Sequence, residues 1–441
     1  MKGYMLMSFY LKGVKVPHKK NTAKMNAVRM PIPSKVCIPM SMHIGAPCVP
    51  VVKKGDTVKV GSLIGEPQGF VSSPIYSSVS GTVASVDEIL LSNGRNCPAV
   101  VIESDGEMTL SDDIKPPVVS TKEEMIVALK NSGIVGLGGA GFPTFVKFAT
   151  DKEIEQLVIN GAECEPYITS DSITMVNNAD DISYAVDKLV SLFGIKKVVI
   201  GIEANKPEAI SVMQDTFATN PLVEIKKLPS LYPQGGEKVL VYHTTRKVIP
   251  MGKLPIDVGV VVSNSTTIAT IGKYLKTGIP LVEKCLTVDG SAVAKPQNII
   301  APIGTSLKDV FDFCGGFKSE PLKILYGGPM MGITVKNLEA PIIKNTNAIL
   351  AFDKIEGKEP KTTACIKCGA CANNCPFGIN PTIIAKAKKN NDIEGLIKAG
   401  TELCMECGCC SFVCPAKRPI VQNNRLAKAM IKNAKQKEDK K

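Results

Sequence analysis

The sequence predicts a multidomain protein of mixed α and β structure. Its 441 residues suggest about three domains at roughly 150 residues each. Short apolar–polar alternations separated by glycines between residues 36 and 103 indicate β-strands, whereas helical and strand patterns alternate after Lys122. Nine of the 15 cysteines crowd into residues 365–414. We expect an N-terminal β region (1–115), an α/β domain (116–277), a smaller β module (278–345), a cysteine-rich domain (360–420) and a basic tail (421–441).

The N-terminal β region carries glycines at a recognisable spacing. Gly55, Gly61 and Gly65, followed by Gly81, resemble the bracket of the biotinyl/lipoyl-type barrel-sandwich hybrid. A carrier domain of that type presents a lysine at a hairpin tip, but residues 67–79 contain no lysine. We therefore expect a structural domain that has no carrier role.

The central region alternates helical and β-branched runs, which is typical of a largely parallel sheet covered by helices. The expected helices are 122–131, 182–193, 207–216 and 266–275, and the expected strands are 157–160, 197–203, 222–228 and 259–263. A β-plus-helix module then opens with residues 281–288. Thr305 or Ser306 is expected to cap its helix.

Two cysteine runs share one pattern in the cysteine-rich domain. Each reads C-x-x-C-x-x-C-x-x-x-C followed by proline, which is the signature of bacterial ferredoxins with two 4Fe–4S clusters. One tight loop supplies three thiolates, and the last cysteine of the other run supplies the fourth. This assigns Cys365, Cys368, Cys371 and Cys414 to one cluster, and Cys404, Cys407, Cys410 and Cys375 to the other. Zinc, the alternative, is usually held by two C-x-x-C pairs, and Cys409 is expected only to pack.

A glycine-rich stretch, Gly-Leu-Gly-Gly-Ala-Gly-Phe-Pro-Thr, spans residues 136–144. Glycines let a backbone approach a ligand closely and expose its N–H groups to phosphate. Lys147 follows as a candidate phosphate-facing cation. The stretch lacks the strand–turn–helix context of a dinucleotide fingerprint, so a flexible connection is the alternative interpretation.

A polar strip, Asn-Gly-Ala-Glu-Cys-Glu-Pro-Tyr, covers residues 160–167 directly after an expected strand. Ligands of parallel sheets bind just beyond the carboxyl ends of strands. Two carboxylates at this place could hydrogen-bond a ribose or an isoalloxazine edge. An ordinary acidic loop fits the spacing equally well.

Charge and composition exclude several function classes. The formal net charge is +12, but no basic stripe is interleaved with aromatic residues, so we expect no nucleic acid partner. No run of about 18 apolar residues occurs, so no transmembrane segment is expected. Residues 1–10 are too short and interrupted for a signal peptide. The thiols are therefore expected to stay reduced in the cytosol, where clustered ones ligate metal.

Taken together, the motifs resemble two related families. Residues 138–147, 160–167 and the Gly-Gly-Glu-Lys at 235–238 resemble the flavin and NADH motifs of the flavoprotein subunit of respiratory complex I. The barrel-sandwich bracket, the stretch 38–47 and the ferredoxin-type tail are similar to the C subunit of the Rnf ion-translocating electron-transport complex. The complex I subunit has one cluster motif where this chain has two, which favours the Rnf-type subunit.

The resemblance implies an α/β domain that binds FMN non-covalently and accepts hydride from NADH, and a β-grasp module of the SLBB type at 278–345. The flavin would link two-electron hydride transfer to the one-electron clusters. Phe142 is expected to stack on a ring. Carried over by motif, the other residues of the flavin–nucleotide site are Gly138, Gly139, Gly141, Lys147, Asn160, Glu163 and Glu165.

The resemblance also implies a setting for the protein. It would be a peripheral electron-transfer subunit on the cytoplasmic face of the cell membrane, in an ion-translocating ferredoxin:NAD oxidoreductase. The other Rnf subunits and NAD(H) would be its partners, with ferredoxin as an indirect electron donor. Two alternatives stay open: a soluble relative that delivers electrons from NADH to a cobalamin or proline-reductase-type acceptor, and a ferredoxin-like adaptor without a working flavin site.

Overall fold

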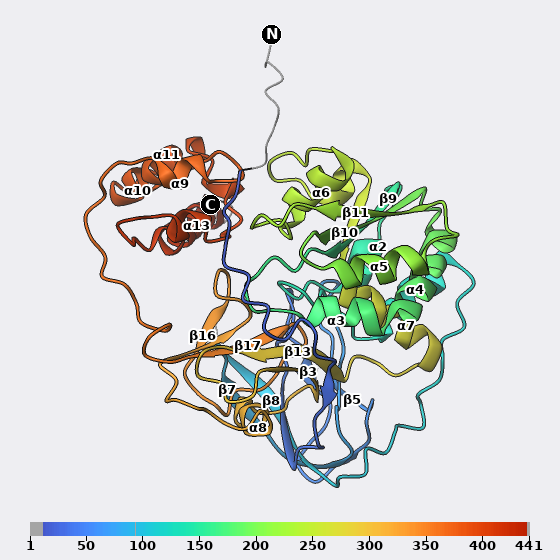
Figure 1. Ribbon diagram of the computed structural model, residues 1–441. Coiled ribbons are helices and arrows are strands. Elements are labelled where there is room, and N and C mark those ends of the chain that lie inside the picture. The colour runs from blue at the N-terminus through green and yellow to red at the C-terminus, as the bar shows by residue number, and fades with distance from the viewer. Residues whose placement is uncertain (1–11, 93, 439–441) are drawn as a thin grey trace.

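The structure is a computed structural model, and it describes residues 12–92 and 94–438 (Figure 1). The prediction about residues 1–10 and the end of the basic tail lie outside these ranges. Figure 1 shows the α/β domain in green and yellow beside a group of C-terminal helices in red, with the β-rich parts of the chain below them. No helix in the described ranges has both the length and the apolar character needed to cross a membrane.

The α/β domain is built on a four-stranded sheet whose strands are all parallel. The spatial order is β11-β10-β9-β12, so the direction of strand addition reverses between β9 and β12. Such a reversal is the place where doubly wound sheets bind ligands. The strands are β9 (Gln156–Gly161), β10 (Lys197–Glu203), β11 (Val223–Leu228) and β12 (Val260–Asn264).

Helices cover both faces of this sheet because alternate strand residues are apolar on each side. Leu157 and Ile159 of β9 belong to one hydrophobic cluster, whereas Val158 between them belongs to another. The predicted parallel α/β domain is confirmed. Its helices are α1 (Lys122–Asn131), α2 (Thr144–Phe148), α3 (Ser170–Asn177), α4 (Ala179–Phe193), α5 (Pro207–Thr216), α6 (Glu237–Thr245), the 3-10 helix η1 (Pro255–Val258) and α7 (Ser265–Thr277).

The N-terminal region forms two small antiparallel sheets, in the orders β2-β8-β7-β4 and β3-β5-β6. Gly81 opens β7 with φ of +151°, and an added Cβ would lie 2.0 Å from the Glu103 carbonyl oxygen. Only glycine fits this close strand approach. The strands are β2 (Lys35–Pro39), β3 (Val49–Pro50), β4 (Thr57–Val58), β5 (Leu63–Glu66), β6 (Ile75–Tyr76), β7 (Gly81–Leu90) and β8 (Asn96–Ser104).

A six-stranded sheet, in the order β1-β14-β13-β17-β15-β16, forms the β-grasp part. Four strands come from the predicted module at 278–345: β13 (Glu283–Asp289), β14 (Gln297–Pro302), β15 (Lys323–Tyr326) and β16 (Ile333–Val335). The other two, β1 (Val28–Arg29) and β17 (Ala348–Phe352), lie outside those bounds, and β17 is fully buried inside the sheet. Ser306 caps α8 (Leu307–Phe313) by accepting from the Asp309 N–H.

The two cysteine runs of the C-terminal module follow the same backbone path. Lys367 and Glu406, each directly before the second cysteine of its run, have φ of 57° and 61°, and Gly369 and Gly408 after it have φ of 76° and 84°. A four-residue helix then follows in each run. The helices of the module are α9 (Ala370–Asn373), α10 (Pro381–Lys389), α11 (Ile393–Lys398), the 3-10 helix η2 (Thr401–Leu403), α12 (Cys409–Phe412) and α13 (Ile420–Glu438).

Candidate functional site

A cavity of about 660 Å³ opens at the carboxyl ends of β9 and β12, and we call it the switch-point cavity. Asn160 and Asn264, which are register partners at these strand ends, both line it. Its volume lies in the range typical of small-molecule sites. All eight residues predicted for the flavin–nucleotide site line this one cavity: Gly138, Gly139, Gly141, Phe142, Lys147, Asn160, Glu163 and Glu165.

The glycine-rich loop forms one wall and is closed by a hydrogen bond of 2.8 Å from the Gly136 N–H to the Phe142 carbonyl. A Cβ at Gly138 would lie 2.3 Å from Nδ2 of Asn264, whereas a Cβ at Gly139 would meet no atom within 4 Å. The loop therefore lies against the end of β12 at Gly138 and leaves open space at Gly139. A phosphate or a planar ring fits such a cradle because no side chain stands in its way.

Other parts of the chain hold the loop in place. The Ile44 N–H donates to the Gly141 carbonyl at 3.0 Å, and Asn345 Nδ2 donates to the Gly139 carbonyl at 2.9 Å. Both the N-terminal domain and the segment before β17 thus position the loop, which the sequence pattern did not reveal.

Lys147 lies in the cavity wall, where its ammonium group donates to the Val262 carbonyl at 2.8 Å. Burial lowers the pKa of Lys147. An ammonium group has three N–H donors, so this bond leaves two for a ligand.

The acidic strip contains two carboxylates with different surroundings. Glu163, which has φ of 45°, accepts from the Asp171 N–H at 2.6 Å and from the Ser172 hydroxyl at 2.5 Å. Burial raises the pKa of Glu163. Its carboxylate thus satisfies free donors in the first turn of α3. It lines the cavity but its oxygens are already engaged.

Glu165 accepts from the backbone N–H groups of Met330 and Met331, at 3.0 and 2.9 Å. Burial raises the pKa of Glu165 to about 7, although these two N–H groups oppose the shift. A carboxyl group with such a pKa changes its protonation near neutral pH.

Two residues that sequence reasoning missed shape the site. Lys20 donates to the carbonyls of Glu163 at 2.8 Å, Glu165 at 2.9 Å and Ile168, so a cation from the N-terminal segment holds the acidic strip. Phe70 lines the cavity, is 63% exposed, and stands edge-on to Phe145 with ring centroids 5.8 Å apart. The only sign of Phe70 in the sequence is that an aromatic residue stands in the stretch 67–79, where a carrier domain would have its lysine.

Seven of the eight predicted cluster ligands lie in two groups, and the eighth, Cys368, is exposed. Cys375, Cys404, Cys407 and Cys410 line one small cavity of about 20 Å³, together with Cys409. In the other group, Cys371 interacts electrostatically with Cys414 and Cys365. The structure thus places the last cysteine of each run beside the other run.

The all-cysteine donor set of these groups is compatible with an iron–sulfur cluster. Asn424 Nδ2 donates to the Cys404 sulfur at 3.5 Å, as amides do around cluster sulfurs. Across residues 12–92 and 94–438, no three His, Cys, Asp or Glu side chains are grouped as ligands of one metal ion.

The switch-point cavity and one cysteine group share a wall. Tyr232 and Met405 line the cavity, and the Tyr232 hydroxyl donates to the Cys407 carbonyl at 2.7 Å. A Cβ at Gly236 would lie 2.3 Å from the terminal methyl of Met405. Cys409 is buried beside Tyr232 in the same hydrophobic cluster.

The chain matches three protein-family profiles. They are the RnfC barrel sandwich hybrid domain over residues 8–107, the Nuo51 FMN-binding domain over 129–273 and the SLBB domain over 286–334. These matches agree in type and order with the predicted barrel-sandwich, α/β flavin and β-grasp parts. The predicted fold class is therefore confirmed, and the cysteine-rich region fits a ferredoxin domain.

Curated relatives extend the match to nearly the whole chain. The chain is 43% identical over 427 residues to the C subunit of the Na(+)-translocating ferredoxin:NAD(+) oxidoreductase complex of Acetobacterium woodii. The aligned region covers 95% of this chain and 96% of that protein. It is also 43% identical over 373 residues to the C subunit of the proton-translocating ferredoxin:NAD(+) oxidoreductase complex of Clostridium ljungdahlii. That aligned region covers 83% of this chain and 81% of the relative.

A solved structure shares the fold alone. It is an NAD+-reducing [NiFe]-hydrogenase in the H2-reduced state, with a TM-score of 0.50 and 17% sequence identity over 70% of this chain and 63% of that one. The family rests instead on the curated relatives and the N-terminal profile. On this basis, the chain belongs to the family of Rnf complex C subunits.

Proposed function

We propose that this chain is the NAD(H)-linked flavin and iron–sulfur subunit of a membrane-bound, ion-translocating ferredoxin:NAD oxidoreductase. Its cofactors would be FMN and two 4Fe–4S clusters, and NADH would be its substrate. The observation that carries the proposal is the wall that the switch-point cavity shares with the Cys407 group. Electrons could pass between a nucleotide-sized cavity and a cluster site that share a wall.

The residues of the switch-point cavity suit FMN and a nicotinamide nucleotide. The glycine-rich loop leaves open space at Gly139, and Lys147 keeps free donors for a phosphate. Phe70 and Phe142 add apolar rings that can exclude water from the cavity. FMN, when bound, would exchange hydride with the nucleotide and single electrons with metal centres. Glu165, with its pKa near 7, can hold or release a proton beside this site.

The two cysteine groups differ in their surroundings, and this suggests an order. Cys404, Cys407, Cys410 and Cys375 stand next to the cavity wall. In the other group, Cys365 and Cys368 are exposed. We infer that the first group holds the cluster next to the flavin site, and that the second group holds the cluster that faces a partner.

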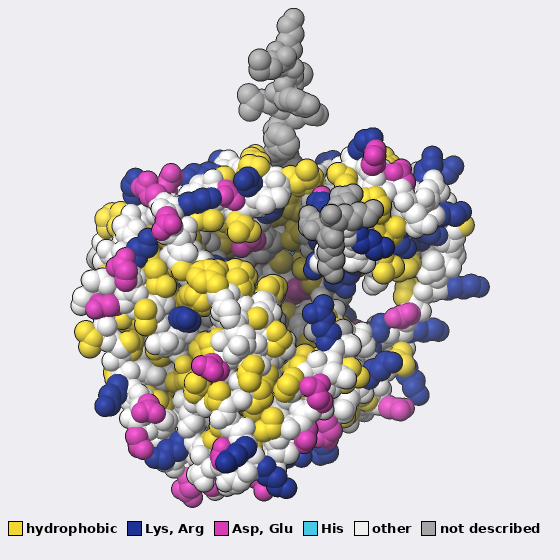
Figure 2. All heavy atoms as spheres, turned by 180° about the vertical axis from the view of Figure 1, so that it is seen from behind, with side chains coloured by type: hydrophobic (Ala, Val, Ile, Leu, Met, Phe, Trp, Pro, Cys, Tyr) yellow, Lys and Arg dark blue, Asp and Glu magenta, His cyan; other side chains and the backbone are white. Residues whose placement is uncertain are grey.

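The surface of the C-terminal module is strongly basic. Residues 361–437 contain thirteen Lys and Arg against four Asp and Glu. Figure 2 shows dark blue side chains gathered over this module at the upper right of the view. An acidic ferredoxin-like partner would be steered toward such a surface. The curated relatives are named as subunits of ion-translocating ferredoxin:NAD(+) oxidoreductase complexes, which favours a complex of that kind over a soluble cobalamin or proline-reductase acceptor.

An anaerobic titration tests the proposal. The full chain is purified without oxygen, its clusters are reconstituted, and NADH is added while flavin and iron–sulfur absorption are recorded and extracted FMN and iron are measured. We expect one FMN and about eight iron atoms per chain, with both absorptions bleached. Clusters without flavin, and no response to NADH, would favour the adaptor interpretation. Co-purification with the other Rnf proteins from membranes, and no NADH-driven reduction of cobalamin, would separate the complex from a soluble reductase.

A further inference from the structure

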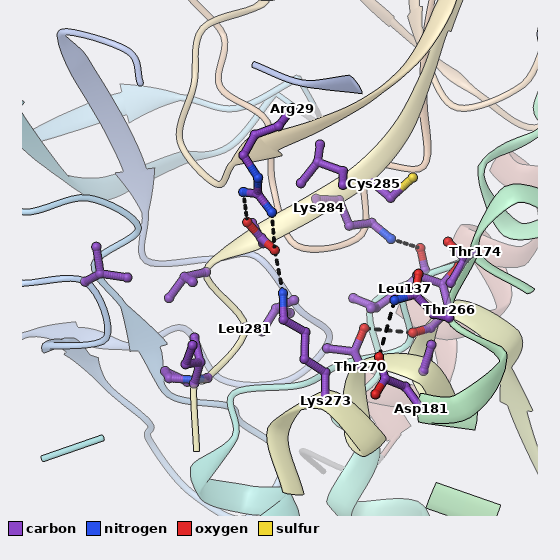
Figure 3. Close-up of a pocket in the computed structure, with 18 of the residues that line it drawn as sticks. Arg29, Leu137, Thr174, Asp181, Thr266, Thr270, Lys273, Leu281, Lys284 and Cys285 are labelled. Atoms are coloured by element: carbon purple, nitrogen blue, oxygen red, sulfur yellow. Dashed lines mark hydrogen bonds and ion pairs between the residues drawn. The ribbon is translucent and has the colours of Figure 1, made fainter. Parts of the chain in front are cut away.

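A second cavity of about 430 Å³, which we call the rear cavity, is lined by Leu137 of the glycine-rich loop (Figure 3). One face of α7 contributes Thr266, Thr270 and Lys273, the α3–α4 corner contributes Thr174 and Asp181, and β13 forms the third side. Among the described residues, it shares no lining residue with the switch-point cavity. The proposed function leaves it without a role.

Lys284 of β13 is the principal polar feature of the rear cavity. Its side chain is 2% exposed, and Figure 3 shows it reaching from the strand toward Leu137, whose carbonyl accepts from Nζ at 3.2 Å. In the described part of the chain, this is the only hydrogen bond of the Lys284 ammonium group. Burial lowers the pKa of Lys284 to about 8, so at pH 7 the group is mostly charged.

The carboxylate that attracts Lys284 electrostatically is already engaged elsewhere. Asp171 accepts from Asn264 at 2.7 Å and from the Thr266 hydroxyl at 2.6 Å. A buried ammonium without a bonded carboxylate is costly. Two of the three N–H donors of Lys284 therefore remain for an anion.

The rest of the lining is balanced in charge and adds few other donors. Arg29 and Lys273 both pair with Glu283, and the other carboxylate of the lining, Asp181, pairs with Lys276. The hydroxyls of Thr174 and Thr270 donate to backbone carbonyls at 2.8 and 2.7 Å. The remaining walls are largely apolar: Val60, Leu110, Ile279, Leu281, Val282 and Ile300.

We propose that the rear cavity binds a small organic monocarboxylate with an apolar body, and that the carboxylate pairs with Lys284. The apolar walls take the body, and the two N–H donors of Lys284 that have no partner take the carboxylate. A phosphate would ordinarily be held by several charged or N–H donors at once, whereas the interior of this cavity offers one buried ammonium. A neutral apolar molecule would leave the ammonium unpaired.

Binding at this site has a consequence for the glycine-rich loop. The carbonyl of Leu137 is held by Lys284, and its N–H donates to the Thr267 hydroxyl at 3.0 Å. A carboxylate on Lys284 competes with that carbonyl and so loosens one of the two hydrogen bonds that hold Leu137. The effect on flavin affinity rests on the proposed function, but the binding itself does not.

Calorimetry with sodium octanoate tests the binding on the anaerobic, cluster-loaded full chain, with octan-1-ol as the neutral probe. We expect one octanoate per chain and no binding of the alcohol. Lys284→Met should weaken octanoate binding about tenfold or more, since it removes a charge-assisted bond. Lys308→Met is the matched control: that lysine is exposed on α8 and pairs with Asp312, so binding should not change.

Ala269→Leu gives an independent variant, because Ala269 lies in the cavity wall and a larger side chain fills the space while Lys284 is kept. It should also abolish octanoate binding. The proposal is overturned if octanoate gives no heat, if octan-1-ol binds equally well, or if binding survives Lys284→Met and Ala269→Leu. It is also overturned if the apparent Kd of octanoate rises in proportion to the FMN concentration without levelling off, because the two molecules would then compete for the switch-point cavity, whereas coupling through Leu137 reaches a limit. If the chain binds octanoate as expected but binds no FMN, only the proposed function is contradicted.

Discussion

The hydroxyl of Tyr232 donates a hydrogen bond of 2.7 Å to the carbonyl oxygen of Cys407, which lies 175 residues further along the chain. Tyr232 lines the switch-point cavity, and Cys407 belongs to the C-terminal module. The ring is buried, and burial raises the pKa of its hydroxyl, so the bond is formed by a neutral phenol away from water. One side chain thus ties the cavity to a predicted cluster ligand.

Tyr232→Phe should slow the reduction of the clusters by NADH and leave the reduction of the flavin unchanged. The variant leaves a buried carbonyl without its donor, which costs about 1–3 kcal/mol and loosens the contact between cavity and module. We expect about a tenfold slower cluster phase in stopped-flow absorption, the equivalent of about 1.4 kcal/mol. Tyr184→Phe, on α4 and far from the module, serves as the control. Identical cluster phases in Tyr232→Phe and the control would show that this bond has no part in the transfer.

Glu165→Gln should change how stability depends on pH. The pKa of Glu165 is raised to about 7 from an ordinary value of 4.5. Its neutral form is therefore the one that folding favours. The contribution of Glu165 to the free energy of unfolding is complete below about pH 4.5 and is lost as the pH rises through about 7. At about 1.4 kcal/mol per pKa unit, the loss amounts to roughly 3 kcal/mol.

The amide of the Gln variant stays neutral at every pH. The thermal unfolding midpoint of Glu165→Gln minus that of the wild type should therefore increase between pH 5 and pH 8. Scanning calorimetry of the cluster-loaded full chain measures this difference. The other titratable groups are the same in both proteins, so their effects cancel. A difference that stays constant over this range would mean that Glu165 does not titrate there.

Phe70→Ala should weaken turnover with NADH without unfolding the protein. The ring is 63% exposed and lines the cavity, so its loss removes little core packing and should change the free energy of unfolding by less than about 1 kcal/mol. We expect a several-fold higher KM for NADH in dye-coupled assays. Leu90→Ala is the control, because Leu90 is 71% exposed at the end of β7. An unchanged KM in Phe70→Ala would remove this ring from the nucleotide site.

Two alanine substitutions in the glycine-rich loop should act differently. Gly139→Ala places its Cβ in open space, so stability should be kept while FMN affinity falls, because the methyl group enters the cradle. Gly138→Ala forces Asn264 to move, and that residue caps α7, so the thermal midpoint should fall as well. FMN fluorescence quenching and thermal scans separate the two effects. Equal FMN affinity of Gly139→Ala and wild type would place the cofactor elsewhere.

Cys375→Ser should remove one cluster and keep the other. Cys375 lines the same small cavity as the predicted ligands Cys404, Cys407 and Cys410 and the neighbouring Cys409, so the iron content should fall by about half. Cys409→Ser is the matched control, since Cys409 packs beside Tyr232 outside the predicted ligand sets. Iron analysis and electron paramagnetic resonance of the reduced protein measure both variants. If Cys409→Ser lost iron and Cys375→Ser did not, the ligand assignment would be wrong.

The sequence by itself determined those features that depend on neighbours along the chain. The strand Lys197–Glu203 and the helix Pro207–Thr216 have the predicted bounds, because β-branched alternation and a proline at the first helical turn act locally. The spacing of the cysteines likewise specifies two matching loops, which share left-handed residues at Lys367 and Glu406.

Tertiary structure alone decided how distant segments meet. β17 enters the middle of the six-stranded sheet from outside the predicted module, and Lys20 holds the acidic strip from 143 residues away. Glu163, predicted to face a ligand, directs its carboxylate to the start of α3, and Phe70 lines the cavity from another domain. Such contacts form only when packing closes long loops, and the residues that make them carry no periodic signal in the sequence.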